Sequence, residues 1–186
     1  DNDGALSITG GATTKSSGSA TIDITNDNSI TLAGAFDSAG SNTATLNLTT
    51  PASSTVTIAD ASIKLANLKI VADDVIGATT ADTVEASGTI VIRPVTSTVA
   101  INLGNTTGGL DLSTAELAAF KAGATSLTIG ADAGGATNKS TGTITVSSDI
   151  TSKNALNLYG GGLVLTGAVT VNDGSANQAF SATLAN

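Results

Sequence analysis

Apolar and small polar residues alternate over about four to six positions at many places along the chain, the pattern of a β-strand with one buried face. In the segment 20–25, the apolar side chains of Ala20, Ile22 and Ile24 would point to one side and the polar ones between them to the other. The alternation recurs at further inward positions: Ala44, Leu46 and Leu48, Val56 and Ile58, Val99, Ile101 and Leu103, Leu127 and Ile129, Ile144 and Val146, Leu156 and Leu158, Leu163 and Leu165, and Val169 and Val171. Outward positions favour threonine, which is β-branched and suits an extended backbone. The pattern predicts an all-β fold.

Two architectures produce short alternating strands separated by corners rich in glycine, serine, asparagine and aspartate. One is a β-sandwich, whose strands are joined by hairpins, and the other is a parallel β-helix, or β-solenoid, with shorter strands. Near the end of the chain, the strand centres at Leu156, Leu163 and Val169 are only six or seven residues apart. This spacing favours successive faces of one solenoid coil. No fixed-length repeat fits the whole chain, so the β-sandwich stays as the alternative.

One segment departs from the β pattern and predicts a short helix near residues 113–122. Ser113 and Glu116 have the spacing of a capping box, and Leu112 and Leu117 have that of a hydrophobic staple. Gly123 can take the left-handed conformation that ends a helix. We expect this helix to be an insertion that packs against the β body.

Composition narrows the classes of partner. Apolar residues make up 40% of the chain and aromatic residues only 2%, so the expected core consists of valine, isoleucine, leucine and alanine. The formal net charge is -8, with 7 lysines and arginines, which provides no basic surface for nucleic acid or anionic lipid. No apolar run reaches the ~18 residues of a membrane-spanning helix, so we expect no membrane insertion of this segment. The chain begins without methionine, and we interpret residues 1–186 as a single solenoid segment of a longer secreted protein.

Candidate chemistry is sparse. The chain has no histidine or cysteine, one arginine and only two glutamates, Glu85 and Glu116. Serine nucleophiles therefore lack a base, and we predict no catalytic residue, no cofactor, no metal site and no enzymatic activity. Four oxygen-rich turns are of the kind that calcium accepts, but none completes a calcium loop, and we interpret them as ordinary Asx turns. They are Asp1-Asn2-Asp3-Gly4, Asn26-Asp27-Asn28, Asp73-Asp74 and Asn172-Asp173-Gly174.

Three strings carry a resemblance to a known family: residues 110–117 (LDLSTAEL), residues 126–130 (SLTIG) and residues 142–146 (GTITV). They resemble repeats of very large filamentous-haemagglutinin-type bacterial exoproteins, in which a short acidic helix precedes such strands. The resemblance covers the second half of the chain, and the first half only by composition. It implies a right-handed parallel β-helix, export from a Gram-negative-type bacterium to the cell surface or medium, and an adhesive or filament-forming role.

The leading functional hypothesis is therefore a non-catalytic structural or adhesive segment, an adhesin stalk or a filament- or matrix-forming subunit. Its partners would be neighbouring segments, sister subunits, or ligands on a host or other surface. The alternative is a glycan- or ice-binding module that uses outward threonines. The candidate threonines are Thr21, Thr45, Thr57, Thr143 and Thr145.

Overall fold

The computed structural model describes residues 4–14, 19–38, 44–59, 62–135 and 137–185. Strands make up 49% of the structure and helices 5%, which confirms the expected all-β fold. The strands form five sheets. Sheet A contains β1 (Leu6–Ile8), β4 (Ile30–Leu32), β7 (Thr55–Ile58) and β10 (Asp74–Ile76), and sheet B contains β2 (Ala12–Thr14), β5 (Phe36–Ser38), β8 (Ile63–Leu65) and β11 (Val84–Ala86).

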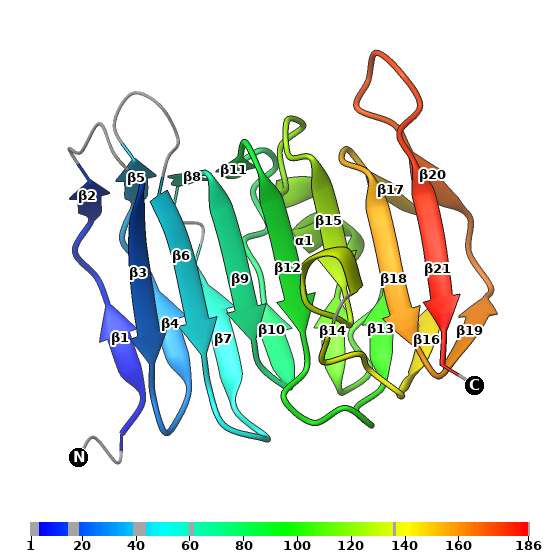
Figure 1. Cartoon of the computed structure of the whole chain (residues 1–186), viewed down its shortest axis with the longest axis horizontal. Coiled ribbons are helices and arrows are strands. Elements are labelled where there is room, and N and C mark those ends of the chain that lie inside the picture. The colour runs from blue at the N-terminus through cyan, green and yellow to red at the C-terminus, as the bar shows by residue number, and fades with distance from the viewer. Residues whose placement is uncertain (1–3, 15–18, 39–43, 60–61, 136, 186) are drawn as a thin grey trace.

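The largest sheet, sheet C, has seven strands and runs along the whole molecule (Figure 1). Its strands are β3 (Ala20–Thr25), β6 (Ala44–Thr49), β9 (Asn67–Val71), β12 (Thr89–Arg93), β15 (Ser126–Ile129), β18 (Leu156–Gly160) and β21 (Phe180–Leu184). Sheet D contains β14 (Leu110–Leu112), β13 (Ile101–Leu103), β16 (Thr143–Val146) and β19 (Gly162–Leu165), and sheet E contains β17 (Ile150–Ser152) and β20 (Val169–Val171).

Neighbouring strands in all five sheets run parallel, and consecutive strands of the chain mostly lie in different sheets. The chain passes through sheets A, B and C in turn, and later through D, E and C. We call one such set of three strands a rung. In Figure 1, sheets A and D follow one another along one face, and β10 lies beside β14. Strands joined by hairpins would be antiparallel, so the alternative of a β-sandwich is wrong.

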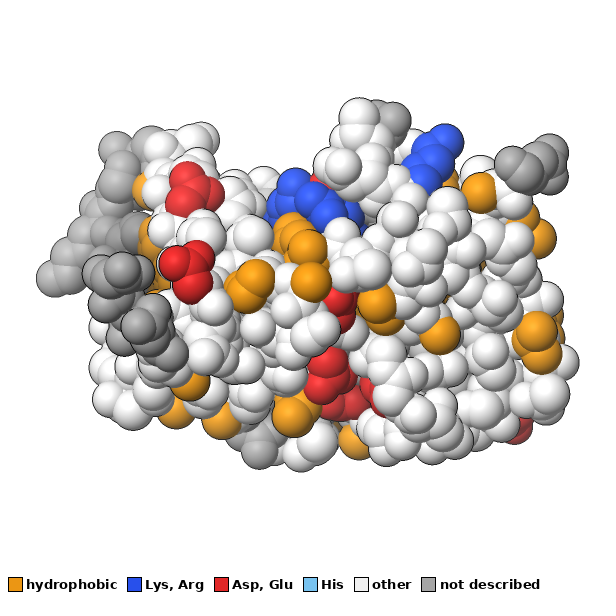
Figure 2. All heavy atoms as spheres, turned by 90° about the horizontal axis from the view of Figure 1, so that it is seen from below, with side chains coloured by type: hydrophobic (Ala, Val, Ile, Leu, Met, Phe, Trp, Pro, Cys, Tyr) orange, Lys and Arg blue, Asp and Glu red, His pale blue; other side chains and the backbone are white. Residues whose placement is uncertain are grey.

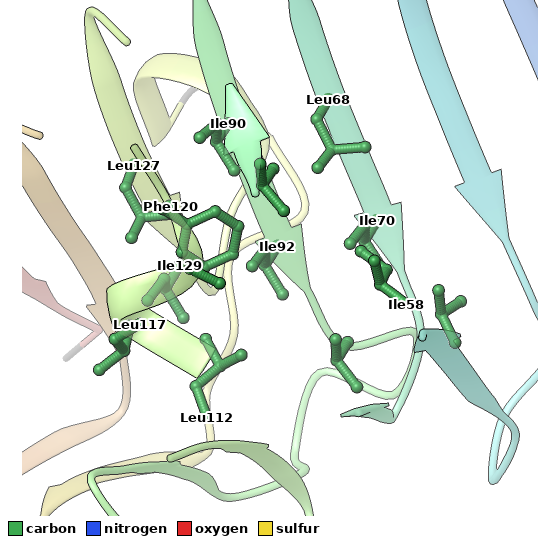
Figure 3. Close-up of a cluster of buried hydrophobic side chains, with 14 of the residues drawn as sticks. Ile58, Leu68, Ile70, Ile90, Ile92, Leu112, Leu117, Phe120, Leu127 and Ile129 are labelled. Atoms are coloured by element: carbon green, nitrogen blue, oxygen red, sulfur yellow. The ribbon is translucent and has the colours of Figure 1, made fainter. Parts of the chain in front are cut away.

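Inward side chains of successive rungs stack into one aliphatic core. In sheet C, the ladder that begins at Ile22 continues through Leu46, Leu68 and Ile90, and the last three are almost fully buried. Figure 3 shows side chains of β9, β12 and β15 pointing into the same space as those of β7 and β14. The predicted alternation is confirmed at these strands, because side chains on a strand point alternately to its two sides.

The spacing between ladder partners explains why no fixed repeat fits the sequence. In sheet C the step is 24 residues from position 22 to 46, then 22 from 46 to 68 and 22 from 68 to 90. It then grows to 37 residues from 90 to 127, falls to 29 from 127 to 156 and returns to 24 from 156 to 180. A nearly regular repeat is thus interrupted by two insertions.

The 37-residue step contains an extra strand of sheet D. The chain first forms β13 beside β16 and then turns back to form β14, which lies between β13 and β10. Asp111 and Asn102 stabilise this turn, because the Asn102 amide donates to Asp111 Oδ1 at 2.8 Å and the Gly108 N–H donates to Asp111 Oδ2 at 2.6 Å. Val99, expected within a strand, precedes β13.

The same step contains the predicted helix, α1 (Thr114–Ala119), which packs beside β17. Its capping box is confirmed, since the Glu116 N–H donates to Ser113 Oγ and the Ser113 N–H donates to the Glu116 carboxylate. The predicted end at Gly123 is wrong. Phe120 already has an extended backbone and forms a parallel bridge with Val84, so pairing with the preceding rung ends the helix early.

Candidate functional site

Most oxygen-rich turns predicted from the sequence use their side chains to hold the backbone. Asp73 is 7% exposed and accepts hydrogen bonds from the Ser53 N–H at 2.9 Å and from the Thr96 N–H and hydroxyl at 2.7 and 2.8 Å. Burial by itself raises the pKa of Asp73, but these hydrogen bonds outweigh burial and lower the pKa below its ordinary value. Asp73 therefore links three turns.

In two other oxygen-rich turns, the side chains also form hydrogen bonds to backbone groups. The buried Asn26 amide donates to the carbonyl oxygens of Gly4 and Ser29. Asp173 accepts hydrogen bonds from the N–H groups of Ser175 and Ala176, which lower its pKa. These contacts support the interpretation as Asx turns. The turn at 1–4 was also a candidate, and its first three residues lie outside the described part of the chain. Within the described residues, no group of three or more acidic, histidine or cysteine side chains has the geometry to hold a metal ion.

One hollow, of about 340 Å³, lies beside β10 and β14. It is lined by Ser53, Thr55, Asp73, Asp74, Val99, Gly108, Gly109 and Asp111. Burial raises the pKa of Asp74, a hydrogen bond from Thr55 opposes this, and the negative charges of Asp111 and Glu116 raise it further. Figure 2 shows acidic side chains gathered near the middle of the face seen from below. The hollow is electrostatically negative, but the oxygens of Asp73 and Asp111 are already engaged in hydrogen bonds.

A second feature is a charged cluster on the outer face of sheet C. The Asp132 carboxylate accepts hydrogen bonds from Lys69 Nζ at 2.7 Å and Arg93 Nε at 2.9 Å, and from the side chains of Thr137 and Asn138 at 2.8 and 2.6 Å. Burial alone raises the pKa of Asp132, but these four donors outweigh burial and hold the pKa well below its usual range. The cluster fixes the segment that follows β15 against β9 and β12.

That segment accounts for the 29-residue step and includes η1 (Ala133–Gly135), which lies against β12 and β15. A methyl group on Gly135 would lie 2.1 Å from the ring of Tyr159, so the backbone approaches the ring as closely as only glycine permits. The single tyrosine therefore packs against this segment. Thr128, at an outward ladder position, is fully buried, and its hydroxyl has no hydrogen-bond partner.

Beside the Asp132 cluster lies a shallow hollow of about 450 Å³ on the outer face of sheet C. It is lined by Thr45, Asn47, Asn67, Leu68, Lys69, Thr89, Val91, Asp132, Ala133 and Thr137. Its amides and hydroxyls continue from strand to strand. The Asn67 amide donates to Thr45 Oγ1 at 3.2 Å, and Asn67 Oδ1 accepts from the Thr89 N–H at 2.8 Å. This polar surface is the candidate binding site of the molecule.

Sequence reasoning predicted the outward polar rows but missed the Asp132 cluster. Lys69, Arg93 and Asp132 are far apart in the chain, and they meet only because strands β9 and β12 are neighbours and the segment after β15 folds back over them. The signal available in the sequence was the isolated position of two cations on strands that otherwise carry almost none.

Comparison of the chain with protein-family models, curated proteins and solved structures finds no match. In the described part of the chain, none of the helices has the length and apolar character needed to cross a membrane.

Proposed function

We propose that the chain is a right-handed parallel β-helix that serves as a non-catalytic structural segment, a stalk or filament element, of an exported bacterial surface adhesin. The observation that carries this proposal is the continuous stack of parallel strands in sheet C over seven rungs. Stacked rungs extend a molecule along one axis by about 4.8 Å each, so a rod grows longer with each added rung while its cross-section stays the same. The resemblance of residues 110–117, 126–130 and 142–146 to exoprotein repeats supports the adhesin context.

The surface chemistry agrees with a structural role. Outward positions of sheet C carry mainly hydroxyls and amides, which bind one another along the ladder, as in the 2.6 Å hydrogen bonds from Asn47 to Asp23 and from Ser181 to Asn157. Such contacts reinforce the stack from outside while the aliphatic core holds it from within. Catalytic chemistry would need titratable groups directed at a pocket, and the buried carboxylates Asp73 and Glu116 are instead bound to backbone N–H groups.

Electron microscopy of a tandem fusion tests the structural role. Two copies joined end to end, with β21 of the first followed by β1 of the second, should form one rod of about twice the length of a single copy. The single chain is the matched control. Two compact particles connected at variable angles would contradict a stack that extends along one axis.

A second candidate function is glycan binding at the hollow beside Asp132. The hollow combines amide, hydroxyl, ammonium and carboxylate groups, which are the hydrogen-bonding partners of sugar hydroxyls. Binding of neutral and acidic oligosaccharides to an array tests this function. Asn47→Ala should abolish any binding, whereas Asn157→Ala, a change in the same outward row but outside the hollow, should not.

The arrangement of the outward threonines gives no support to the ice-binding variant of this alternative. The proposed threonines do not form one row, because Thr21 and Thr45 pair in sheet C, Thr57 lies in sheet A, and Thr143 and Thr145 lie in sheet D. In sheet C the threonine columns stop at β9, where asparagine, lysine and valine take the outward positions. Even in β3 and β6, the outward threonines are four residues apart, with Asp23 or Asn47 between them, so these strands form no Thr-x-Thr pair.

A further inference from the structure

Three of the seven basic residues of this acidic chain lie around the segment that follows β15. Lys69 and Arg93 both contact Asp132, and Lys139 belongs to the same segment as Asp132. In the part of the chain that the structure describes, Asp132 is the only carboxylate within ion-pair distance of any of these three cations. Three cations thus share one carboxylate here, although the whole chain carries a net charge of -8.

Arg93 keeps hydrogen-bond donors that the fold does not use. Its side chain is only 15% exposed. Arg93 Nε donates to Asp132 Oδ1 at 2.9 Å, and Nη1 donates to the carbonyl oxygen of Pro94 at 3.2 Å. An arginine side chain has five N–H groups, so three of them have no acceptor among the described residues. A guanidinium held in place with N–H groups to spare suits a carboxylate, which it binds through two parallel hydrogen bonds.

The Arg93 side chain borders a small hollow of about 70 Å³ beside the turn that follows β12. Lys139 lines the same hollow, together with the polar side chains of Asn138 and Ser140, and the described lining includes no carboxylate. The volume is roughly twice the ~30 Å³ that one water molecule occupies in the liquid. The hollow therefore admits a carboxylate group but not a whole sugar ring.

The Asp132 cluster joins this small hollow to the larger polar hollow of about 450 Å³. Lys69 and Thr137 line the larger hollow, and Arg93 and Asn138 line the smaller one. All four donate to the Asp132 carboxylate, so both of its oxygens are engaged. A ligand that occupies both hollows needs an anionic group for the smaller one and hydroxyl groups for the amides and hydroxyls of the larger one.

We infer that the small hollow binds the carboxylate of an acidic saccharide, a uronic-acid unit whose neighbouring sugar units lie in the larger hollow. Arg93 and Lys139 hold the carboxylate. The inference rests on the second candidate function, glycan binding, and names the class of glycan. A nucleic acid carries a phosphate on every nucleotide and is repelled by the net charge of the chain. An acidic peptide has no sugar hydroxyls for the larger hollow.

Isothermal titration calorimetry of the whole chain with a hexamer of galacturonic acid tests this inference. The chain should bind the hexamer, and added sodium chloride should weaken the binding because salt screens the charges. The fully methyl-esterified hexamer keeps the sugar backbone without the negative charges, and it should bind at least about tenfold more weakly, because hydrogen bonds to a charged group are lost. Equal affinity for the two hexamers would overturn the inference and leave glycan binding at the larger hollow standing.

Two lysine variants locate the binding. Lys139→Ala should weaken binding of the galacturonate hexamer about tenfold, since the hollow loses one of its two cations. Lys64→Ala is the matched control, because Lys64 is exposed on β8 in sheet B and its loss changes the net charge equally. It should leave the affinity unchanged. Equal losses in the two variants, with the β signal kept in circular dichroism, would indicate attraction to overall charge and overturn the inference.

A peptide separates the classes of acidic ligand. Hexaglutamate carries one carboxylate per unit, like the galacturonate hexamer, but has no hydroxyl groups, and it should bind at least about tenfold more weakly. Equal binding would assign the small hollow to acidic peptides and overturn the inference. Failure of both sugar hexamers to bind would overturn the inference together with the glycan function, and the length of the tandem fusion would still decide the structural role.

Discussion

At the scale of single residues, the alternation between neighbours on a strand decides which side chains hold the fold. Ile144 is fully buried, with Ile101 and Leu163 as its ladder partners on the two sides, whereas Thr143 is exposed and Thr145 half-buried. The sequence alone predicted this contrast, because a period of two is visible over as few as four residues.

Ile144→Ala should therefore lower the free energy of unfolding by about 2 to 5 kcal/mol, through the lost transfer free energy and the cavity that remains. Thr143→Ala and Thr145→Ala should each change it by no more than about 1 kcal/mol. Urea denaturation of the three variants measures these differences. Equal losses at Thr143 and Ile144 would show that the inward and outward faces are wrongly assigned.

The raised pKa of Asp74 predicts that the folding stability of the protein depends on pH. Burial and the nearby negative charges of Asp111 and Glu116 raise the pKa of Asp74 in the folded state. Because the pKa of Asp74 is higher in the folded state than in the unfolded state, protonated Asp74 contributes favourably to folding stability. This contribution is fully present below the unfolded-state pKa, about 3.9, and is lost as the pH rises through the folded-state pKa. Asp74→Asn should therefore stabilise the protein at pH 7, and this gain should vanish near pH 3.

Urea denaturation at the two pH values measures the gain, with Asp27→Asn on the exposed turn as the control. An equal effect of Asp74→Asn at both pH values would show that the charge of Asp74 is not what destabilises the folded state.

At the scale of elements, the helix shows how a local signal acquires a long-range role. Glu116 is 6% exposed, and besides closing the capping box it accepts a hydrogen bond from the Gly77 N–H at 2.6 Å. The sequence indicated the box, since its residues are three apart, but not the contact with Gly77, 39 residues away. That contact depends on the extra strand that places α1 beside the turn after β10.

Glu116→Ala should cost about 2 to 5 kcal/mol, because two backbone N–H groups, of Gly77 and Ser113, lose their acceptor and each unsatisfied group costs about 1–3 kcal/mol. Ser113→Ala, which removes only the other half of the box, should cost about 1 kcal/mol. Thr114→Ala, at the exposed first helical position, serves as the control. Thermal unfolding followed by circular dichroism can rank the three. A loss at Glu116 no larger than that at Ser113 would argue against the bond to Gly77.

The strands of the regular rungs could be predicted from the sequence, whereas the interruptions could not. Steps of 22 and 24 residues in sheet C maintain one register, but the steps of 37 and 29 residues contain a doubled strand and a segment that folds over the outer face. Their positions depend on distant pairings such as Asp132 with Lys69 and Arg93. Local alternation carries no information about which strands become neighbours.

The regular register permits removal of one rung. Deleting residues 46–67 joins Thr45 directly to Leu68, the ladder partner of Leu46, so the inward and outward positions stay in phase. The shortened chain should still unfold cooperatively in urea, with a smaller denaturant slope because less surface is exposed. Deleting residues 46–66 joins two outward positions and shifts the pattern by one residue, which should prevent folding. Equal behaviour of the two deletions would contradict the stacked register.

At the scale of the whole molecule, stability and reach have the same origin. Each rung buries its apolar side chains against its neighbours, so length is added without a larger cross-section. Within the described residues, the inward positions of the first and last rungs are more exposed than those of the rungs between them, because each end rung has a neighbouring rung on one side only.

The central claim, that the strands of sheet C stack in the order β3 to β21, is tested most directly by distances between paired spin labels. The chain contains no cysteine, so labels attach only where cysteine is introduced. One pair, Asp23→Cys and Ser181→Cys, is separated by six steps from strand to strand in sheet C. The other pair, Asn47→Cys and Asn157→Cys, is separated by four such steps. At about 4.8 Å per step, electron spin resonance should give mean distances near 29 Å and 19 Å. Two equal distances, or a shorter one for the outer pair, would contradict the stack.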